Sequence, residues 1–194
     1  MPDDTWIVVG LGNPGPDYAA TRHNIGHLVL ELLAERAGAK LKAHRRARAD
    51  VAETRLGDLP GVRAVLAKPR SYMNLSGGPV AALCQFFKVG PERLIVIHDE
   101  IDLEYGTLRV KFGGGDNGHN GLRSVRAAVG TGDFFRVRFG VSRPPGRLEP
   151  ASYVLKSWSA TERKDLDVHI DRAADAVEAL VVDGLPYAQN HYNS

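Results

Sequence analysis

Leu94-Ile95-Val96-Ile97-His98-Asp99 is the most strand-like segment of the sequence: four apolar residues run together, and two titratable residues follow them. A short run that is apolar throughout predicts a central strand of an α/β sheet, covered on both faces. Trp6–Val9 is a second such run, and Gly10 ends it. The two runs predict the buried centre of one sheet.

Helical and strand-like segments alternate along the rest of the chain. Further strands are predicted at 51–56, 62–67, 107–112 and 136–141, and the turn at 57–61 predicts that the first two pair antiparallel. Helices are predicted from the N-cap Asn24 to Gly38, over 79–88, over 121–129, and from the capping box Ser159/Glu162 to Gly184. This order predicts a single three-layer α/β/α domain over residues 1–194, with a twisted, mixed and mostly parallel central sheet.

The composition is that of an ordinary globular protein. Of 194 residues, 43% are hydrophobic and 25% are charged, and 25 Lys and Arg against 23 Asp and Glu give a net charge of +2. The single cysteine, Cys84, excludes an internal disulfide framework, and its apolar helical surroundings predict a core residue. No run approaches the ~18 apolar residues of a membrane span. Asp3 and Asp4 stand where a signal peptide needs basic residues. We therefore expect a soluble, cytoplasmic protein.

Short polar side chains follow three of the predicted strands. Asn13 follows the first strand, Asn74 follows 62–67, and Asp99 follows 94–97. Because ligands of open α/β sheets bind beyond the carboxyl ends of the strands, we expect these residues to line one cleft. His23, between the first strand and its helix, lies on the same rim if that helix folds back over the sheet.

A histidine beside an aspartate suits proton transfer. A neutral imidazole can take a proton from water, and a carboxylate on its other nitrogen fixes the tautomer. The sequence has no G-x-S-x-G nucleophile elbow. The pattern therefore favours hydrolysis by activated water, with asparagines that orient the water or stabilise an oxyanion.

Three motifs leave alternatives open. Gly10-x-Gly12-x-x-Gly15 follows a strand, as the dinucleotide-binding fingerprint of an oxidoreductase does, although no acidic residue ends a following parallel strand. His23-x-x-x-His27 has the spacing of two metal ligands on a helix, as in a metal hydrolase, but with Asn where metalloproteases carry Glu. The glycine-rich loop at 113–118 is either flexible or exposes backbone N–H groups to an anion.

Basic residues cluster in two segments although the total charge is nearly balanced. One segment lies around Gly38 and the other flanks the glycine-rich loop; they contain Arg36, Lys40, Lys42, Arg45, Arg46 and Arg48, and Lys111, Arg123, Arg126, Arg136 and Arg138. Runs of charge are most often solvated faces, but beside the expected cleft they also fit a polyanionic substrate. A non-catalytic RNA-binding module would use these clusters and would need neither His23 nor Asp99.

Five motifs together resemble the bacterial-type peptidyl-tRNA hydrolases. They are Gly-Leu-Gly-Asn-Pro-Gly at 10–15, Tyr-Ala-Ala-Thr-Arg-His-Asn-Ile-Gly at 18–26, Lys-Pro-Arg-Ser-Tyr-Met-Asn-Leu-Ser-Gly at 68–77, His-Asp-Glu-Ile-Asp at 98–102, and Gly-Gly-Gly-Asp-Asn-Gly-His-Asn-Gly-Leu-Arg at 113–123. The similarity spans nearly the whole chain. One departure is Asp116-Asn117, where the family often has a histidine and then a glycine.

The resemblance implies hydrolysis of the ester that joins a peptide to the 3′-terminal ribose of tRNA, by a monomer without metal or cofactor. It implies that His23 activates water and that Asp99 orients His23. The implied substrate and tRNA contacts are Asn13, Asn74 and Asn120 in the cleft, Met73 and His119 in its wall, Tyr18 beside the tRNA end, and Lys111 and Arg138 on a tRNA phosphate. The loop at 142–151 is a candidate lid.

Overall fold

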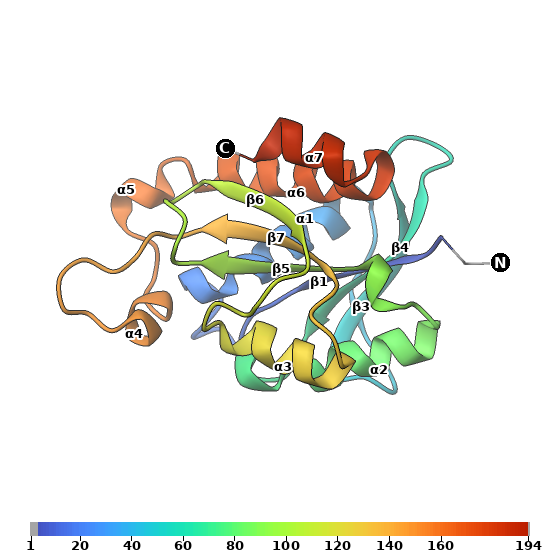
Figure 1. Cartoon of the computed structure of the whole chain (residues 1–194), viewed down its shortest axis with the longest axis horizontal. Helices are drawn as coiled ribbons and strands as arrows, with labels where there is room; N and C mark the ends of the chain where they lie inside the picture. Colours follow the sequence, from blue (N-terminus) through green and yellow to red (C-terminus); the bar gives the residue numbers. More distant parts are fainter. Residues whose placement is uncertain (1–3, 194) are drawn as a thin grey trace.

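The computed structural model describes residues 4–193, and within them one mixed sheet has seven strands in the order β2-β3-β4-β1-β5-β7-β6 (Figure 1). The strands are β1 (Trp6–Gly10), β2 (Lys42–Ala43), β3 (Ala49–Leu56), β4 (Val62–Pro69), β5 (Leu94–Glu100), β6 (Leu108–Phe112) and β7 (Phe135–Gly140). The neighbours β4, β1, β5 and β7 run parallel, whereas β3 and β6 pair antiparallel with β4 and β7. This sheet confirms the predicted mixed, mostly parallel topology.

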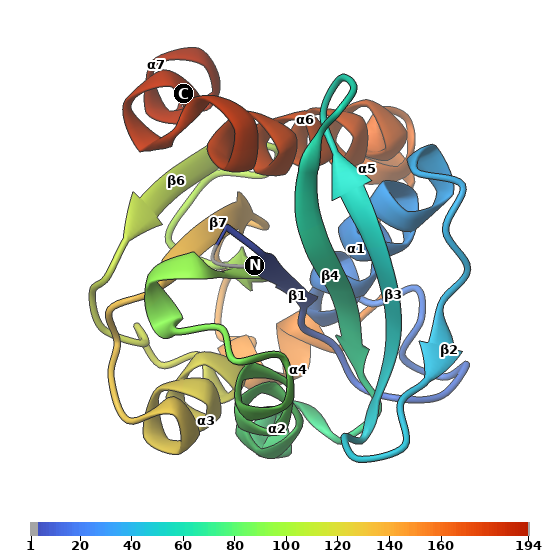
Figure 2. The ribbon, with the colours of Figure 1, turned by 90° about the vertical axis from the view of Figure 1, so that its right-hand side faces the viewer.

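Helices cover both faces of the sheet. They are α1 (Ile25–Arg36), α2 (Gly77–Phe87), α3 (Asn120–Val129), α4 (Pro150–Val154), α5 (Ala160–Arg163), α6 (Leu166–Asp183) and α7 (Leu185–Tyr192), with short 3-10 turns η1 (Arg22–Asn24), η2 (Met73–Leu75) and η3 (Pro91–Arg93). Figure 2 shows α6 and α7 on one side of the sheet and α2 and α3 on the other. The three layers of the predicted α/β/α domain are thus confirmed.

The central strands divide their side chains between two cores. Val8 and Ile95 pack with α1 and α6, whereas Ile7, Val9 and Val96 pack with α2 and α3. This alternation follows from the two-residue period of a strand. Every residue of β5 is buried; the apolar run predicts this for Leu94–Ile97, and the burial continues through His98, Asp99 and Glu100. Cys84 is partly buried against the second core.

Two glycines let α1 lie directly against β1 and β5. A Cβ atom on Gly10 would collide with the carbonyl oxygen of Gly26, and a Cβ on Gly26 would collide with the carbonyl oxygen of Ile97. A Cβ on Gly12 would lie 2.6 Å from the ring of His27. Gly10 and Gly12 of the supposed dinucleotide motif are therefore explained by packing, whereas Gly15 has a positive φ of 97° and no neighbour within 4 Å of an added Cβ. The helix α1 begins only at Ile25, far beyond that motif.

The predicted start of the last helix was wrong, and the predicted cap of α1 differs in one detail: Asn24 is in the N-cap position. Asn24 does not cap α1 with its side chain, because that side chain bonds to the backbone of Asn13 instead. The Ser159/Glu162 capping box exists, but it starts the separate short helix α5, and α6 begins at Leu166. Gly184 does end α6, and α7 follows it at once.

The sequence patterns did not predict three elements of the structure, which are β2, α4 and α7. Of the acidic start of the chain, Asp3 lies outside the described residues. In the part that the structure describes, no helix combines the length and apolarity needed to cross a bilayer.

Gly26→Ala should destabilise the protein, because the added methyl group must push α1 away from the carboxyl ends of β1 and β5. We expect a loss of about 1–3 kcal/mol in the free energy of unfolding, measured by urea denaturation. Gly78→Ala in α2 is the matched control: its Cβ would meet nothing within 4 Å, so it should be neutral or stabilising by up to ~1 kcal/mol. Equal stabilities for the two variants would contradict this account of α1 packing.

Candidate active site

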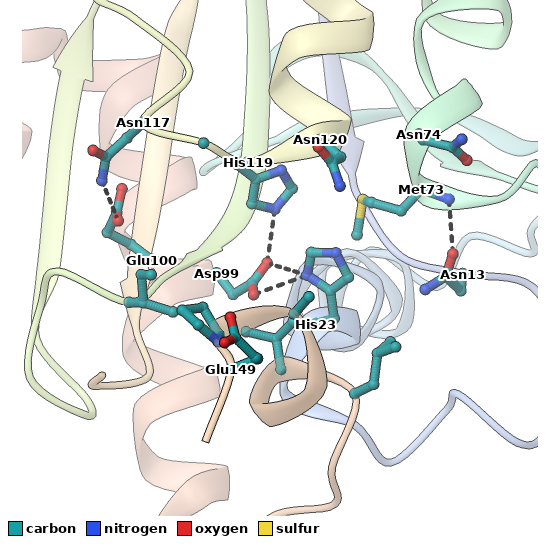
Figure 3. A pocket seen from close by; sticks show the side chains of 16 residues that line it. Asn13, His23, Met73, Asn74, Asp99, Glu100, Asn117, His119, Asn120 and Glu149 are labelled. Atoms are coloured by element: carbon teal, nitrogen blue, oxygen red, sulfur yellow. Dashed lines mark hydrogen bonds and ion pairs between the residues drawn. The ribbon is translucent and has the colours of Figure 1, made fainter. Parts of the chain in front are cut away.

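Most of the predicted site residues meet in one pocket beyond the carboxyl ends of the central strands (Figure 3). The pocket has a volume of about 520 Å³, and the predicted residues that line it are Asn13, His23, Met73, Asn74, Asp99, His119 and Asn120. They come from separate segments of the chain: after β1, after β4, at the end of β5 and at the start of α3. Tyr18, Lys111 and Arg138 are not in its lining.

His23 and Asp99 form a hydrogen-bonded pair. Nδ1 of His23 lies 2.9 Å from Oδ2 and 3.0 Å from Oδ1 of Asp99. Asp99 is only 3% exposed. A carboxylate can only accept, so Nδ1 carries the proton of the neutral ring. Nε2 of His23 is then left with a lone pair, as a base requires.

His119 makes a second hydrogen bond to the same carboxylate, which its predicted role as a wall residue did not include. Its Nε2 lies 2.8 Å from Oδ1 of Asp99, and its Nδ1 accepts from the backbone N–H of Leu122 at 3.2 Å. His119 thus caps the N-terminus of α3, and this cap fixes Nε2 as the N–H donor to Asp99. The cap position next to Asn120 is the sequence signal that could have located this ring.

The pair and its neighbours have shifted proton affinities. Burial acts to raise the pKa of Asp99, but the charges and hydrogen bonds of His23 and His119 outweigh it and hold that pKa well below its usual range. Burial acts to lower the pKa of His23, but Asp99 outweighs it and the pKa is raised above 6.5. Burial lowers the pKa of His27 to about 3 and that of His98 well below 6.5. Asp99 therefore stays ionised, and His23 loses a bound proton only above pH 6.5.

Asn13 is held rigidly in the pocket wall. Asn24 accepts from its backbone N–H and donates to its carbonyl oxygen, both at 2.9 Å. Oδ1 of Asn13 accepts from the N–H of Met73 at 2.7 Å, as Figure 3 shows. Because its oxygen is used in this way, Asn13 presents its amide N–H groups to the pocket. Asn24 thus positions Asn13, a role that its prediction as a helix cap did not include.

The opposite wall of the pocket is mostly apolar. It consists of Ile101, just after β5, and, from α4 and its flanks, Glu149, Pro150, Ala151, Val154 and Leu155, of which Glu149 alone is charged. Arg22 attaches this wall to η1, the turn that contains His23: its Nη2 lies 2.7 Å from Oε1 of Glu162, and its guanidinium carbon lies 4.2 Å from the centroid of the Tyr153 ring. The sequence patterns predicted a loop here and indicated neither α4 nor the role of Arg22.

A smaller cavity of about 360 Å³ lies beside the pocket and holds the two predicted phosphate contacts. Lys111 on β6 and Arg138 on β7 line it together with His98, Glu100 and Arg136, among others. Nη2 of Arg138 lies 3.0 Å from Oε1 of Glu100. Burial and the nearby charges of Arg138 and Arg136 lower the pKa of Lys111. Three cations, Lys111, Arg136 and Arg138, therefore line this cavity against two carboxylates, Glu100 and Asp102.

The glycine-rich loop is bound to its own chain. The carbonyl oxygens of Gly114 and Gly115 accept from the buried guanidinium of Arg136. Asn117 donates to Oε2 of Glu100 at 2.7 Å, so the loop also closes the wall between the pocket and the cavity. Two of its backbone carbonyls therefore face a cation, and Asp116 adds a negative charge.

His23, Asp99 and His119 are also the group of the described residues that could hold a metal ion, with ligand atoms within 4.8 Å of one another. Each of these residues takes part in a hydrogen bond within the group. The alternative pair of His23 and His27 is not supported, because His27 is buried beside Gly12 and outside the pocket lining.

Comparison with known proteins identifies the family to which the chain belongs. The family model described as peptidyl-tRNA hydrolase matches residues 7–194. The chain belongs to the peptidyl-tRNA hydrolase family. It is 58% identical to the peptidyl-tRNA hydrolase of Frankia alni over 192 residues, covering 99% of this chain and 95% of the relative. The enzyme of Streptomyces coelicolor is also 58% identical, with 97% and 95% covered.

A solved structure shows the same fold. The crystal structure of the peptidyl-tRNA hydrolase from Acinetobacter baumannii superimposes with a TM-score of 0.89 at 35% identity, covering 99% of this chain and 96% of that one. The family and the fold that the motifs imply are therefore confirmed, and the chain is an enzyme of the ester hydrolase class.

The histidine titrations provide a direct check of the site. We expect His23 to titrate above pH 6.5 and His27 and His98 to remain neutral well below it, followed by the ¹⁵N chemical shifts of the rings in NMR. Asp99→Asn removes the charge that outweighs burial, so the pKa of His23 should fall below 6.5. An unchanged His23 titration in the Asp99→Asn variant would show that the pairing does not control this imidazole.

Proposed function

We propose that this protein hydrolyses the ester bond between a peptide, or an N-blocked amino acid, and the 3′-terminal ribose of tRNA. The observation that carries the proposal is the pair of His23 and Asp99, with Nε2 of His23 left as a base beside three asparagines in one pocket. Membership of the peptidyl-tRNA hydrolase family supports the same reaction.

His23 acts as general base towards water. Nε2 takes a proton as the water oxygen bonds to the ester carbonyl carbon, and Asp99 stabilises the imidazolium that forms. The tetrahedral intermediate then collapses, the bond from carbon to the ribose oxygen breaks, and the imidazolium returns its proton to that oxygen. The products are a peptide with a free carboxyl group and a tRNA with a free 3′-terminal hydroxyl group.

Asn13 is the best placed donor for the oxyanion. Its side-chain oxygen is already occupied by Met73, so its N–H groups can donate to developing negative charge without reorganisation. Asn74 and Asn120 are exposed in the pocket lining and present amides that can pair with a peptide backbone, which needs both a donor and an acceptor. Met73 and the wall of α4 provide apolar contacts to the substrate.

Lys111 and Arg138 bind a phosphate of the tRNA in the cavity beside the pocket. Their mutual repulsion, which contributes to the lowered pKa of Lys111, is relieved when an anion is bound. Tyr18 packs edge-on against Tyr72, with ring centroids 6.4 Å apart, and lies beside the tRNA end. The protein acts in the cytoplasm as a monomer, without a metal or a cofactor.

The decisive experiment is an ester hydrolysis assay on N-blocked aminoacyl-tRNA with and without EDTA. Release of free tRNA that is insensitive to EDTA supports the proposal. Release that EDTA abolishes favours a metal hydrolase, and tRNA binding without release favours an RNA-binding module. Titration with NAD and FAD tests the remaining oxidoreductase alternative, for which we expect no binding.

His23→Ala should reduce the single-turnover rate by about 10²–10⁴-fold or more, because general base catalysis is lost. Folding and tRNA affinity should be largely unchanged. The matched control is His169→Ala, which also removes an imidazole that pairs with an aspartate, Asp165, but lies outside the pocket. A His23 variant that retains most of the rate would reject the role of His23.

Lys111→Ala and Arg138→Ala should each raise KM and leave kcat nearly unchanged. Each lost phosphate contact should reduce the slope of log KM against log salt concentration by about 0.7–0.9. Lys164→Ala, at an exposed lysine after α5, should leave both quantities unchanged. Salt slopes that match the wild type in both variants would remove the phosphate contact.

A further inference from the structure

A second group of cations lies at the opposite edge of the sheet from Lys111 and Arg138. This group, the β2-edge patch, consists of exposed side chains on β2, on the loop to β3 and just after β4: Lys42, Arg45, Arg46, Arg48 and Arg70. Among the ion pairs of residues 4–193, the patch has a single acidic partner, Asp50, which lies 3.5 Å from Arg70. The other four cations have no carboxylate partner in that part of the chain.

Two hydrogen bonds close the loop that carries the patch. The backbone N–H of His44 donates to the carbonyl of Ala49 at 2.9 Å, and Nδ1 of His44 accepts from the N–H of Arg46 at 3.1 Å. Ala47 is buried between the exposed arginines. A loop closed in this way loses little conformational entropy when its cations bind a partner.

An aromatic ring lies among these cations. Phe86 near the end of α2 is 47% exposed. The ring of His44 meets it edge-on with centroids 4.6 Å apart, and the guanidinium carbon of Arg46 lies 5.9 Å from its centroid. Exposed aromatic rings between unpaired cations are the pattern by which proteins bind RNA strands, through stacking and phosphate contacts.

The patch is connected to the active site through the chain itself. The N–H of Arg70 donates to the carbonyl of Arg48 at 2.7 Å, which places the loop beside the carboxyl end of β4. Two residues later the exposed Tyr72 packs against Tyr18, and Met73 binds Asn13 in the pocket. Cations and exposed rings therefore lead from the edge of the sheet to the rim of the pocket.

The patch and the Lys111–Arg138 cavity cannot hold the same phosphate. β2 and β6 are the two edges of the sheet, six strand spacings of about 4.8 Å apart, or roughly 29 Å. A ligand that touches both groups must be a long polyanion that passes across the pocket. We propose that the β2-edge patch is a second RNA contact, which binds the phosphate backbone of the same tRNA whose 3′ end is in the pocket.

This inference rests on the proposed function for the identity of the RNA, although the RNA contact can be measured without any turnover. An acidic nascent peptide is the other anion that could reach the patch. The observations favour RNA, because four unpaired cations match the charge of a phosphate backbone whereas peptides differ in charge from one to the next. Binding of deacylated tRNA, which carries no peptide, distinguishes RNA from an acidic peptide as the partner of the patch.

The test compares two triple variants that lose the same charge. One is Arg45→Gln/Arg46→Gln/Arg48→Gln in the patch. The other is Arg55→Gln/Arg63→Gln/Lys164→Gln, three exposed cations away from the pocket lining and the patch. Binding of deacylated tRNA is measured as a function of salt, and KM and kcat are measured on N-blocked aminoacyl-tRNA and on the same ester of a CCA trinucleotide. Circular dichroism confirms that each variant is folded.

We expect the patch variant to bind deacylated tRNA about tenfold or more weakly at low salt, with a salt slope reduced by about 2–3, whereas the control matches the wild type. Its KM should rise on whole tRNA and stay unchanged on the trinucleotide, at constant kcat. Equal tRNA affinities and slopes for the two variants would overturn the proposal. So would a rise in KM on N-blocked aminoacyl-tRNA that is not accompanied by weaker binding of deacylated tRNA. Patch-dependent tRNA binding by a wild-type protein that cleaves neither ester would refute the proposed function and leave the RNA contact standing.

Discussion

The carboxylate of Asp99 accepts hydrogen bonds from two imidazoles, and the rest of the site depends on that arrangement. A carboxylate that is 3% exposed is costly to bury unless it is paired and hydrogen-bonded. His23 and His119 provide the pairing and the hydrogen bonds, and the carboxylate fixes the tautomer and the orientation of each ring. As the proposed base, His23 therefore needs no reorganisation when water binds, and preorganisation of this kind is a major source of catalysis. The backbone N–H of Leu122 extends the chain of bonds to α3, so the position of a helix terminus is coupled to the charge in the pocket.

The scaffold brings separate chain segments within reach of that carboxylate. Gly10 and Gly26 let α1 approach β1 and β5 so closely that η1, which carries His23, sits above the end of β5. Asn24 then bonds to both backbone groups of Asn13 and so fixes the loop after β1 relative to η1. A shift of α1 would move His23 and Asn13 together, away from an aspartate on a fully buried strand. Packing and chemistry are thus coupled at the same few residues.

Local sequence patterns predicted the parts of the fold that local physics determines. The apolar runs of β1 and β5, and the asparagines and aspartate after the strands, were predictable because a parallel sheet sends the carboxyl ends of its strands to one edge. The capping box at Ser159 was also predictable, but the helix it begins was not, because α5 ends after one turn and α6 starts anew. The bond from His119 to Asp99 and the ion pair of Arg22 with Glu162 join residues 20 and 140 positions apart. Such contacts depend on tertiary packing, and no window of sequence contains them.

The groups proposed to carry out the reaction are buried, whereas the groups proposed to bind RNA are near the edges of the sheet. The proposed reacting groups lie at the centre of the sheet, where Asp99 and the end of β5 are buried, whereas the cations proposed to bind RNA lie at or near its two edges, on β6 and β7 and around β2. Salt screens exposed charges strongly and buried pairs weakly. Ionic strength should therefore act on the binding of a polyanion and hardly at all on the proton transfer at His23. The same separation lets the edge residues vary in charge without disturbing the pairing of His23 with Asp99, because the edge patch and the catalytic pair share no hydrogen-bonding partner among the described residues.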